Sequence, residues 1–198
     1  MSRPQNKNRL PPELLLSAYS QGYFPMPQSE TNEILWYRPD PRAVIPLDNF
    51  HASRSLQRTL KRSHFTITFD SAFREVMLGC ADRKETWITD EFLTAYTELH
   101  HLGFAHSVEV WSKDRQLVGG VYGVSLGGAF FAESKFHRKT DASKVALYHL
   151  VQRLKAQHFT LLEVQFMTPH LATLGALEIP DDIYQLRLAK ALLIETTF

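Results

Sequence analysis

The sequence has a single cysteine, Cys80, among 198 residues. One thiol cannot form a disulfide within the chain, which excludes the small secreted folds that depend on disulfides and agrees with a reducing compartment. The longest leucine run, in ELLLSAYS, is too short for a membrane span or for the apolar part of a signal peptide. We therefore expect a soluble, cytoplasmic protein that does not enter a membrane.

Neither sign of charge is in excess, since 22 Lys and Arg residues stand against 21 Asp and Glu. A surface for nucleic acid would therefore require a local cluster of cations. Common metal and nucleotide motifs are lacking: nine histidines occur without HExxH or paired CxxC, and the glycine pairs lack GxGxxG spacing and a Walker lysine. No GxSxG motif or recognisable Cys-His pair supplies a nucleophile. We expect no metal, no cofactor and no covalent intermediate.

Helices and strands alternate with short connections along the first half of the chain. A short helix is expected over ELLLSAYSQ, and Ser53 is suited to cap a second helix over SRSLQRTLKRS. FTITF alternates as a strand. Asp70 is expected to cap the helix that follows this strand, and Thr89 or Asp90 to cap the next one.

The second half of the chain has the order β-β-β-α-β. AHSVEVW, LVGGVYGVSLGG and AFFAES are expected to form three sequential antiparallel strands. Asp141 is expected to cap a long helix with an apolar stripe, and TLLEVQF follows as a buried strand. The predicted fold class is α+β. An antiparallel-rich mixed sheet with packed helices is expected over 91–198, after a short N-terminal segment, 1–48, and a small α/β portion, 49–90.

Polar residues interrupt two of the apolar strands. Glu133 follows AFFA, while Glu163 and Gln165 lie within LLEVQF. A buried carboxylate without a partner is costly, so these residues are either paired or functional. Because side chains alternate along a strand, Glu163 and Gln165 are expected to project from one face, and Glu133 and Glu109 are candidates for the same face. A hydrogen-bonded structural pair and a pair that binds and deprotonates an amine both fit this pattern.

A cluster of cations lies on the helix predicted over SRSLQRTLKRS. Leu56 and Leu60 form its narrow apolar stripe. The other faces carry four cations and no acid: Arg54, Arg58, Lys61 and Arg62. Either a solvated helix face or a surface that contacts phosphates explains this composition.

Segments along most of the chain resemble, in the same order, those of the leucyl/phenylalanyl-tRNA–protein transferases. The resemblance runs from about Leu16 to Ile183 and includes AYSQGYFPM, LWYRPDPRAVIPL, SRSLQRTLKRS, TWIT, AYTELHHLGFAHSVEVW, LVGGVYGV, FAESKF, ASKVAL and EVQFMTPHLATLGALEIP. Members of that family move Leu or Phe from charged tRNA onto proteins that begin with Lys or Arg, which marks those proteins for degradation. Their C-terminal domain has an acetyltransferase-like (GNAT) fold, in agreement with the β-β-β-α-β order.

The resemblance also implies roles for individual residues. Glu163 and Gln165 match the catalytic pair, and Tyr37 and Trp87 would stack on the terminal adenosine of the tRNA. The four cations of SRSLQRTLKRS match a cluster that contacts the tRNA. The pocket for the aminoacyl side chain and the N-terminal peptide would be lined by Val121, Phe130, Ala132, Glu133 and Lys135.

The implied chemistry requires neither ATP nor metal, because an aminoacyl ester is already activated. An amide has almost no basicity, so we expect Gln165 to orient the attacking amine and Glu163 to accept charge directly or through water. Glu163 replaces the usual aspartate of the family, Lys135 replaces a methionine, and the N-terminal segment is shorter than in many relatives. A monomer is expected. Two alternatives remain: an N-acyltransferase of the same fold that uses acyl-coenzyme A, and a catalytically idle RNA-binding module.

Overall fold

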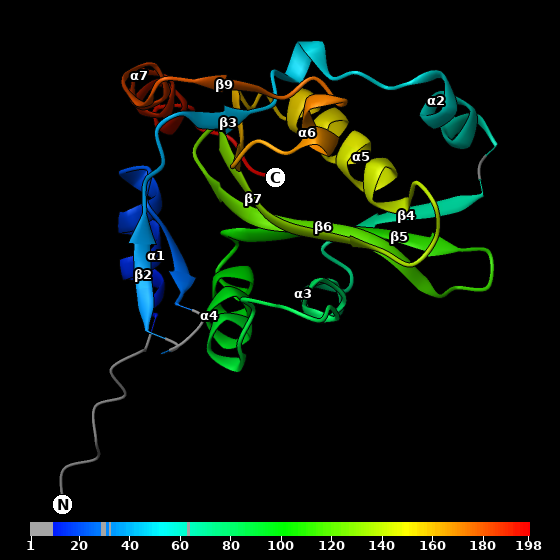
Figure 1. Cartoon of the computed structure of the whole chain (residues 1–198), viewed down its shortest axis with the longest axis horizontal. Coiled ribbons are helices and arrows are strands. Elements are labelled where there is room, and N and C mark those ends of the chain that lie inside the picture. The colour runs from blue at the N-terminus through cyan, green and yellow to red at the C-terminus, as the bar shows by residue number, and fades with distance from the viewer. Residues whose placement is uncertain (1–9, 29–30, 32, 63) are drawn as a thin grey trace, which may run out of the picture.

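A seven-stranded mixed sheet with helices on both faces forms the centre of the computed structural model, which describes residues 10–28, 31, 33–62 and 64–198 (Figure 1). Its strands are β3 (Arg42–Val44), β4 (Phe65–Phe69), β5 (Ala105–Ser112), β6 (Leu117–Leu126), β7 (Ala129–His137), β8 (Leu161–Gln165) and β9 (Leu177–Ile179). They lie in the order β4-β5-β6-β7-β8-β3-β9. Only β7 and β8 pair in parallel, so the prediction of an antiparallel-rich mixed sheet is confirmed.

Helices cover both faces of this sheet. They are α1 (Pro12–Ser20), α2 (Arg54–Lys61), α3 (Phe73–Ala81), α4 (Asp90–His101), α5 (Ala142–Ala156), α6 (Pro169–Ala172) and α7 (Asp181–Leu192), together with a 3-10 turn, Leu47–Asn49. Figure 1 shows α3 and α4 on one face and α5 on the other, in agreement with the elements that each helix contacts. A separate two-stranded sheet, β1 (Phe24–Pro27) and β2 (Ile34–Tyr37), lies beside α1. The predicted order β-β-β-α-β is observed as β5-β6-β7-α5-β8, and the predicted α+β class is confirmed.

Two of the predicted helix caps are confirmed. The hydroxyl of Ser53 accepts from the amide of Leu56 at 3.2 Å, and that of Thr89 accepts from the amide of Phe92. These bonds satisfy amides that a helix leaves without a partner in its first turn.

The other two caps differ from the prediction. Ala72 is the N-cap of α3, and the carboxylate of Asp70 instead accepts from the amide of Ser107 at 2.8 Å. Asp141 does occupy the N-cap position of α5, but its side chain makes no capping bond and contacts Lys144 at 2.9 Å. Asp70 therefore makes a contact with a strand 37 residues away, and Asp141 makes a local ion pair in place of a cap.

The sheet divides two hydrophobic cores. The predicted apolar stripe of α5 is fully buried against one face: Ala142, Val145, Ala146, Leu150, Val151 and Leu154. On the other face, aromatic and aliphatic side chains of α3 and α4, among them Val76 and Phe92, form one cluster with Tyr122 of β6. Burial of each large side chain contributes about 1.5–3 kcal/mol, so these two interfaces hold the sheet in place.

Strands from the first half of the chain complete the sheet of the second half. β3 lies between β8 and β9, and β4 extends the sheet beyond β5. β9 was not predicted. The first nine residues of the predicted segment 1–48 lie outside the described residues, and the predicted division at 48 and 90 stays a prediction.

None of the helices in the described ranges has the length and apolar character needed to cross a bilayer.

Candidate active site

A β-bulge in β7 places Glu133 at the centre of the candidate site. Tyr122 on β6 pairs with Ser134, but the next residue, Gly123, pairs with Ala132, so Glu133 has no partner on β6. A Cβ at Gly123 would lie 2.2 Å from the carbonyl oxygen of Phe131. Any residue other than glycine would therefore clash at this position. Bulges re-aim side chains, and this one presents the Glu133 carboxylate to residues from other elements.

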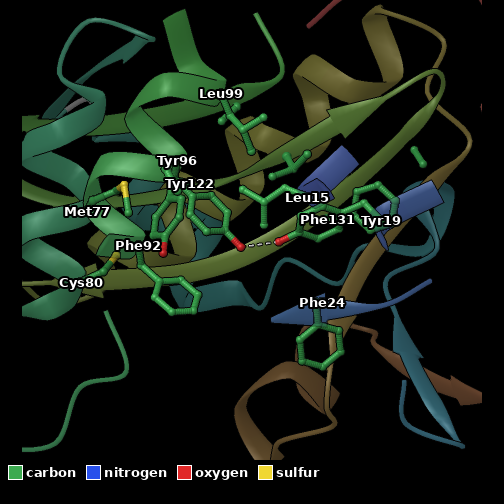
Figure 2. Close-up of a cluster of buried hydrophobic side chains, with 14 of the residues drawn as sticks. Leu15, Tyr19, Phe24, Met77, Cys80, Phe92, Tyr96, Leu99, Tyr122 and Phe131 are labelled. Carbon is green, nitrogen blue, oxygen red and sulfur yellow. Dashed lines mark hydrogen bonds between the residues drawn. The ribbon is translucent and has the colours of Figure 1, made fainter. Parts of the chain in front are cut away.

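Two elements donate hydrogen bonds to the Glu133 carboxylate. Its Oε1 accepts from the hydroxyl of Tyr19 on α1 at 2.7 Å and from the amide of Gln165 on β8 at 3.0 Å. The hydroxyl of Tyr19 also meets that of Tyr96 on α4 at 2.5 Å, the dashed contact in Figure 2. Glu133 is therefore held in place by residues that are distant in the sequence.

Burial determines the acidity of this carboxyl group. Loss of hydration raises the pKa of Glu133 from its ordinary value to about 8, against the opposing hydrogen bonds from Tyr19 and Gln165. The nearby charge of Glu163 raises the pKa further. Such a carboxyl group takes up and releases protons in the range in which an α-amine titrates, because a model α-amine has a pKa of about 7.7–8.0.

Gln165 adopts an unusual backbone conformation at the end of β8. Its φ is +63°, in the left-handed region that residues other than glycine seldom occupy. The alternation of side chains between the two faces of a strand therefore does not fix the direction of the Gln165 side chain. Its amide donates to the carboxylate of Glu133. Local strain of this kind is concentrated at functional sites.

Glu163 lies in a different set of contacts. It forms a buried ion pair with Arg42 of β3, with Nη1 and Oε1 2.5 Å apart, and its other oxygen accepts from the hydroxyl of Tyr184 on α7. Arg42 also donates to the carbonyl oxygen of Gly22 at 2.6 Å. Burial raises the pKa of Glu163, and the positive charge of Arg42 opposes this rise. Within the protein the two side chains have different partners: Glu163 links β8 to β3 and α7, while Gln165 contacts Glu133. Their joint action on one substrate group stays a prediction.

A small cavity of about 60 Å³ opens beside Glu133. Four of the five residues predicted for the aminoacyl pocket line it: Val121, Ala132, Glu133 and Lys135. The fifth, Phe130, is buried in the core against Phe198. Glu109, a candidate for the same face, is elsewhere, where its carboxylate accepts from the hydroxyls of Thr68 and Ser107.

Lys135 lies at the junction of two spaces. It lines the small cavity and also a larger cleft of about 430 Å³, which Arg83, Arg138 and His170 line as well. Burial lowers the pKa of Lys135, and no carboxylate within the described ranges pairs with it. The guanidinium of Arg83 spans the edge of this cleft and donates to the hydroxyl of Ser134 at 3.1 Å.

The residues predicted to contact tRNA lie outside the small cavity. Tyr37 is 37% exposed and stacks on Phe24, while Trp87 is half-buried and packs edge-on against Phe92. The cations of α2 are all exposed, and no carboxylate in the described part of the chain pairs with them: Arg54, Arg58, Lys61 and Arg62. Their positions allow contact with a large ligand, and their roles stay predictions.

The partners of the buried carboxylates were not predicted from the sequence. Tyr19 and Tyr96 lie within AYSQGYFPM and AYTELHHLGFAHSVEVW, two of the family-like segments, which is the one signal that pointed to them. Arg42 lies within a third such segment, LWYRPDPRAVIPL, whereas Tyr184 lies outside them in an ordinary helical pattern. No local pattern pairs either residue with Glu163, because Arg42 is 121 residues away from it and Tyr184 reaches it from a different element, α7.

A buried carboxyl group of raised pKa on a bulged strand beside a cavity is typical of a site that transfers protons. Two family models match the chain: that of the leucyl/phenylalanyl-tRNA protein transferase over residues 44–189, and that of its N-terminal domain over residues 8–40. The chain belongs to the leucyl/phenylalanyl-tRNA protein transferase family.

Individual relatives are similar over nearly their whole length. The leucyl/phenylalanyl-tRNA–protein transferase of Herpetosiphon aurantiacus is 56% identical over 191 residues, which cover 96% of this chain and 98% of the relative. That of Gloeobacter violaceus is 50% identical, with 96% and 97% covered. Among solved structures, FemX is 11% identical with a TM-score of 0.49, and the match covers 87% of this chain and 70% of that protein.

Proposed function

We propose that this protein transfers leucine or phenylalanine from charged tRNA to the α-amine of proteins that begin with lysine or arginine, and so marks them for degradation in the cytoplasm. Membership of the family supports this proposal. The observation that carries it is the contact between Gln165 and Glu133 at the wall of the small cavity, where an amide and a carboxyl group with a pKa of about 8 meet.

The reaction joins an amine to an activated ester. The α-amine of the acceptor attacks the ester carbonyl carbon, the new C–N bond forms, and the C–O bond to the tRNA breaks. The amine loses one proton, and the 3′-oxygen of the tRNA gains one as it leaves. No ATP is consumed, because conversion of the aminoacyl ester to an amide is itself favourable in free energy.

Each of the site residues has a separate task in this scheme. Glu133 in its ionised form accepts the proton from the amine, because its raised pKa makes it a stronger base than an ordinary carboxylate. Gln165 has no useful basicity and orients Glu133 and the amine through its amide group. Glu163 holds β8 against β3 through Arg42, which fixes the position of Gln165.

The cavity and its surroundings hold the remaining parts of the substrates. Val121, Ala132 and Leu171 supply an apolar wall for a leucine or phenylalanine side chain. Trp87 and Tyr37 stack on the terminal adenosine, where each aromatic contact contributes about 1–3 kcal/mol. The cations of α2 contact the phosphates of the same tRNA.

The direct test mixes the protein with radiolabelled leucyl- or phenylalanyl-tRNA and a peptide that begins with Arg or Lys. We expect label on this peptide and none on a matched peptide that begins with Asp. Absence of label with several charged tRNAs would contradict the proposal. Binding of tRNA without transfer would favour an idle RNA-binding module, and labelling from acyl-coenzyme A alone would favour an N-acyltransferase.

A further inference from the structure

Two clefts share Arg138, which lies directly after β7. The first is the cleft of about 430 Å³ that Lys135 connects to the small cavity. The second, of about 740 Å³, is lined by Arg138, Lys139 and Lys113 together with His64. The two clefts therefore form adjoining depressions around the turn between β7 and α5.

The charge around these clefts is strongly one-sided. Five cations line them, against two carboxylates, Asp82 and Asp114: Arg83, Lys113, Lys135, Arg138 and Lys139. Asp82 neutralises part of this charge through an exposed ion pair with Arg138 at 3.2 Å. Lys113 and Lys139 are exposed and have no carboxylate partner in the ranges that the structure describes. The whole chain is close to neutral, so this cluster is a local feature.

The cationic clefts continue the basic surface of α2. The hydroxyl of Thr59 on α2 contacts the carboxylate of Asp141 at 3.2 Å, which brings α2 against the turn between β7 and α5. His64, two residues beyond Arg62, lines the second cleft. Figure 1 shows α2 and this turn at the same end of the molecule.

We propose that the turn between β7 and α5, with Lys113, Arg138 and Lys139, binds phosphates of the tRNA acceptor arm and directs its 3′ end from α2 past Lys135 to the small cavity. This inference rests on the proposed function. Planar guanidinium and flexible ammonium groups around an open cleft are suited to a phosphate backbone. A protein acceptor that begins with Lys or Arg carries extra positive charge, which this surface repels, so the RNA is the favoured ligand.

The test uses the full chain and two double variants. Lys113→Ala/Lys139→Ala removes two exposed cations that form no ion pair with any described residue. Arg187→Ala/Lys190→Ala removes two exposed cations from α7, at the other end of the molecule. For the first variant we expect roughly tenfold weaker binding of aminoacyl-tRNA and a salt dependence reduced by about 1.4–1.8 in log–log slope. The α7 variant should bind like the wild type.

A second donor separates phosphate binding from chemistry. An adenosine that carries leucine or phenylalanine on its 3′-oxygen has the reactive ester but no phosphate, so the Lys113→Ala/Lys139→Ala variant should use it as fast as the wild type does. Equal loss with both donors would overturn the proposal, as would an unchanged affinity and salt slope for tRNA. Weaker binding of the acceptor protein alone would assign the surface to that protein instead. Failure of wild-type protein with both donors would refute the proposed function itself, a separate result.

Discussion

The side-chain amide of Gln165 donates a 3.0 Å hydrogen bond to Glu133, and so joins the last residue of β8 to the bulged residue of β7. The parallel pairing of these strands brings the two residues together, with Phe131 opposite Glu163 in register. This contact therefore depends both on the bulge in β7 and on the position of the end of β8.

Replacement of Gln165 by Ala should lower the rate of aminoacyl transfer roughly 10²-fold, because the amide no longer orients Glu133 and the amine. Affinity for tRNA should stay within about twofold, since the phosphate contacts are elsewhere. Single-turnover transfer and filter binding measure the two quantities. Gln152→Ala, an exposed glutamine on α5, is the matched control. Equal loss of transfer and of tRNA binding would indicate a structural role.

Glu133 should make stability depend on pH. Burial raises its pKa from 4.5 to about 8, so between these values the folded protein holds a proton that the unfolded chain has lost. Its contribution to the free energy of unfolding is therefore largest below about 4.5, falls as pH rises, and is constant above about 8. The slope from one such group is at most about 1.4 kcal/mol per pH unit.

Urea denaturation at several pH values between these limits measures this slope. Glu133→Gln should reduce this slope by up to about 1.4 kcal/mol per pH unit, and Glu75→Gln, which removes an exposed carboxylate from α3, should leave it unchanged. An unchanged slope in Glu133→Gln would show that another group is responsible.

Loss of one partner of the ion pair between Arg42 and Glu163 should destabilise the fold by about 3–5 kcal/mol, because the other charge stays buried. The double variant Arg42→Met/Glu163→Leu should lose less than the sum of the two single variants. A double-mutant cycle in urea measures this coupling. If Glu163→Gln keeps the stability of the wild type but loses transfer, Glu163 rather than Glu133 is the proton acceptor.

Replacement of Gly123 by Ala should both destabilise the protein and displace Glu133. The added methyl group meets the carbonyl oxygen of Phe131, and overpacking of this kind costs about 1–3 kcal/mol. Thermal unfolding measures the first effect, and transfer by the folded protein below the transition measures the second. Wild-type rates in a destabilised Gly123→Ala protein would show that the bulge does not position Glu133.

The cations of α2 should contribute to the salt dependence of tRNA binding. Arg58→Ala/Arg62→Ala should weaken binding and reduce the slope of log affinity against log salt by about 0.7–0.9 for each lost contact. Filter binding over a range of salt concentrations gives the slope, with Arg187→Ala/Lys190→Ala as the control. An unchanged slope would make α2 an ordinary solvated helix face.

The regular elements could be predicted from the sequence because their signals are local. The stripe of α5, the caps at Ser53 and Thr89 and the order β5-β6-β7-α5-β8 each depend on residues within a few positions of one another. Asp70 shows the limit of such signals: it stands where a cap is expected, but the amide of Ser107 on β5 binds its carboxylate.

Three polar residues of the candidate site stand out in the sequence, but their hydrogen-bond partners do not. Glu133, Glu163 and Gln165 all stand out as polar residues in apolar strands, and alternation places Glu163 beside Gln165. The bulge at Glu133 and the positive φ of Gln165 change this pattern, and both arise from tertiary structure. Arg42, which pairs with Glu163, lies 121 residues away from it in the sequence. The periodicity of a helix or strand predicts contacts only between residues a few positions apart, so it cannot predict this pair.

The position of β3 constrains how the chain reaches its native state. β3 bonds to β8 on one side and to β9 on the other, so residues 42–44 cannot pair before residues 161–179 exist. Until then β3 of a nascent chain is an unpaired strand. In a fragment limited to 91–198, β3 is missing, so the edge of β8 has unpaired backbone groups that can bond to other chains. Such distant pairing slows folding, since a long loop must close first. The same arrangement makes the first half of the chain a structural part of the acyl-transfer sheet, so cleavage between the halves should cause aggregation rather than release of two folded units.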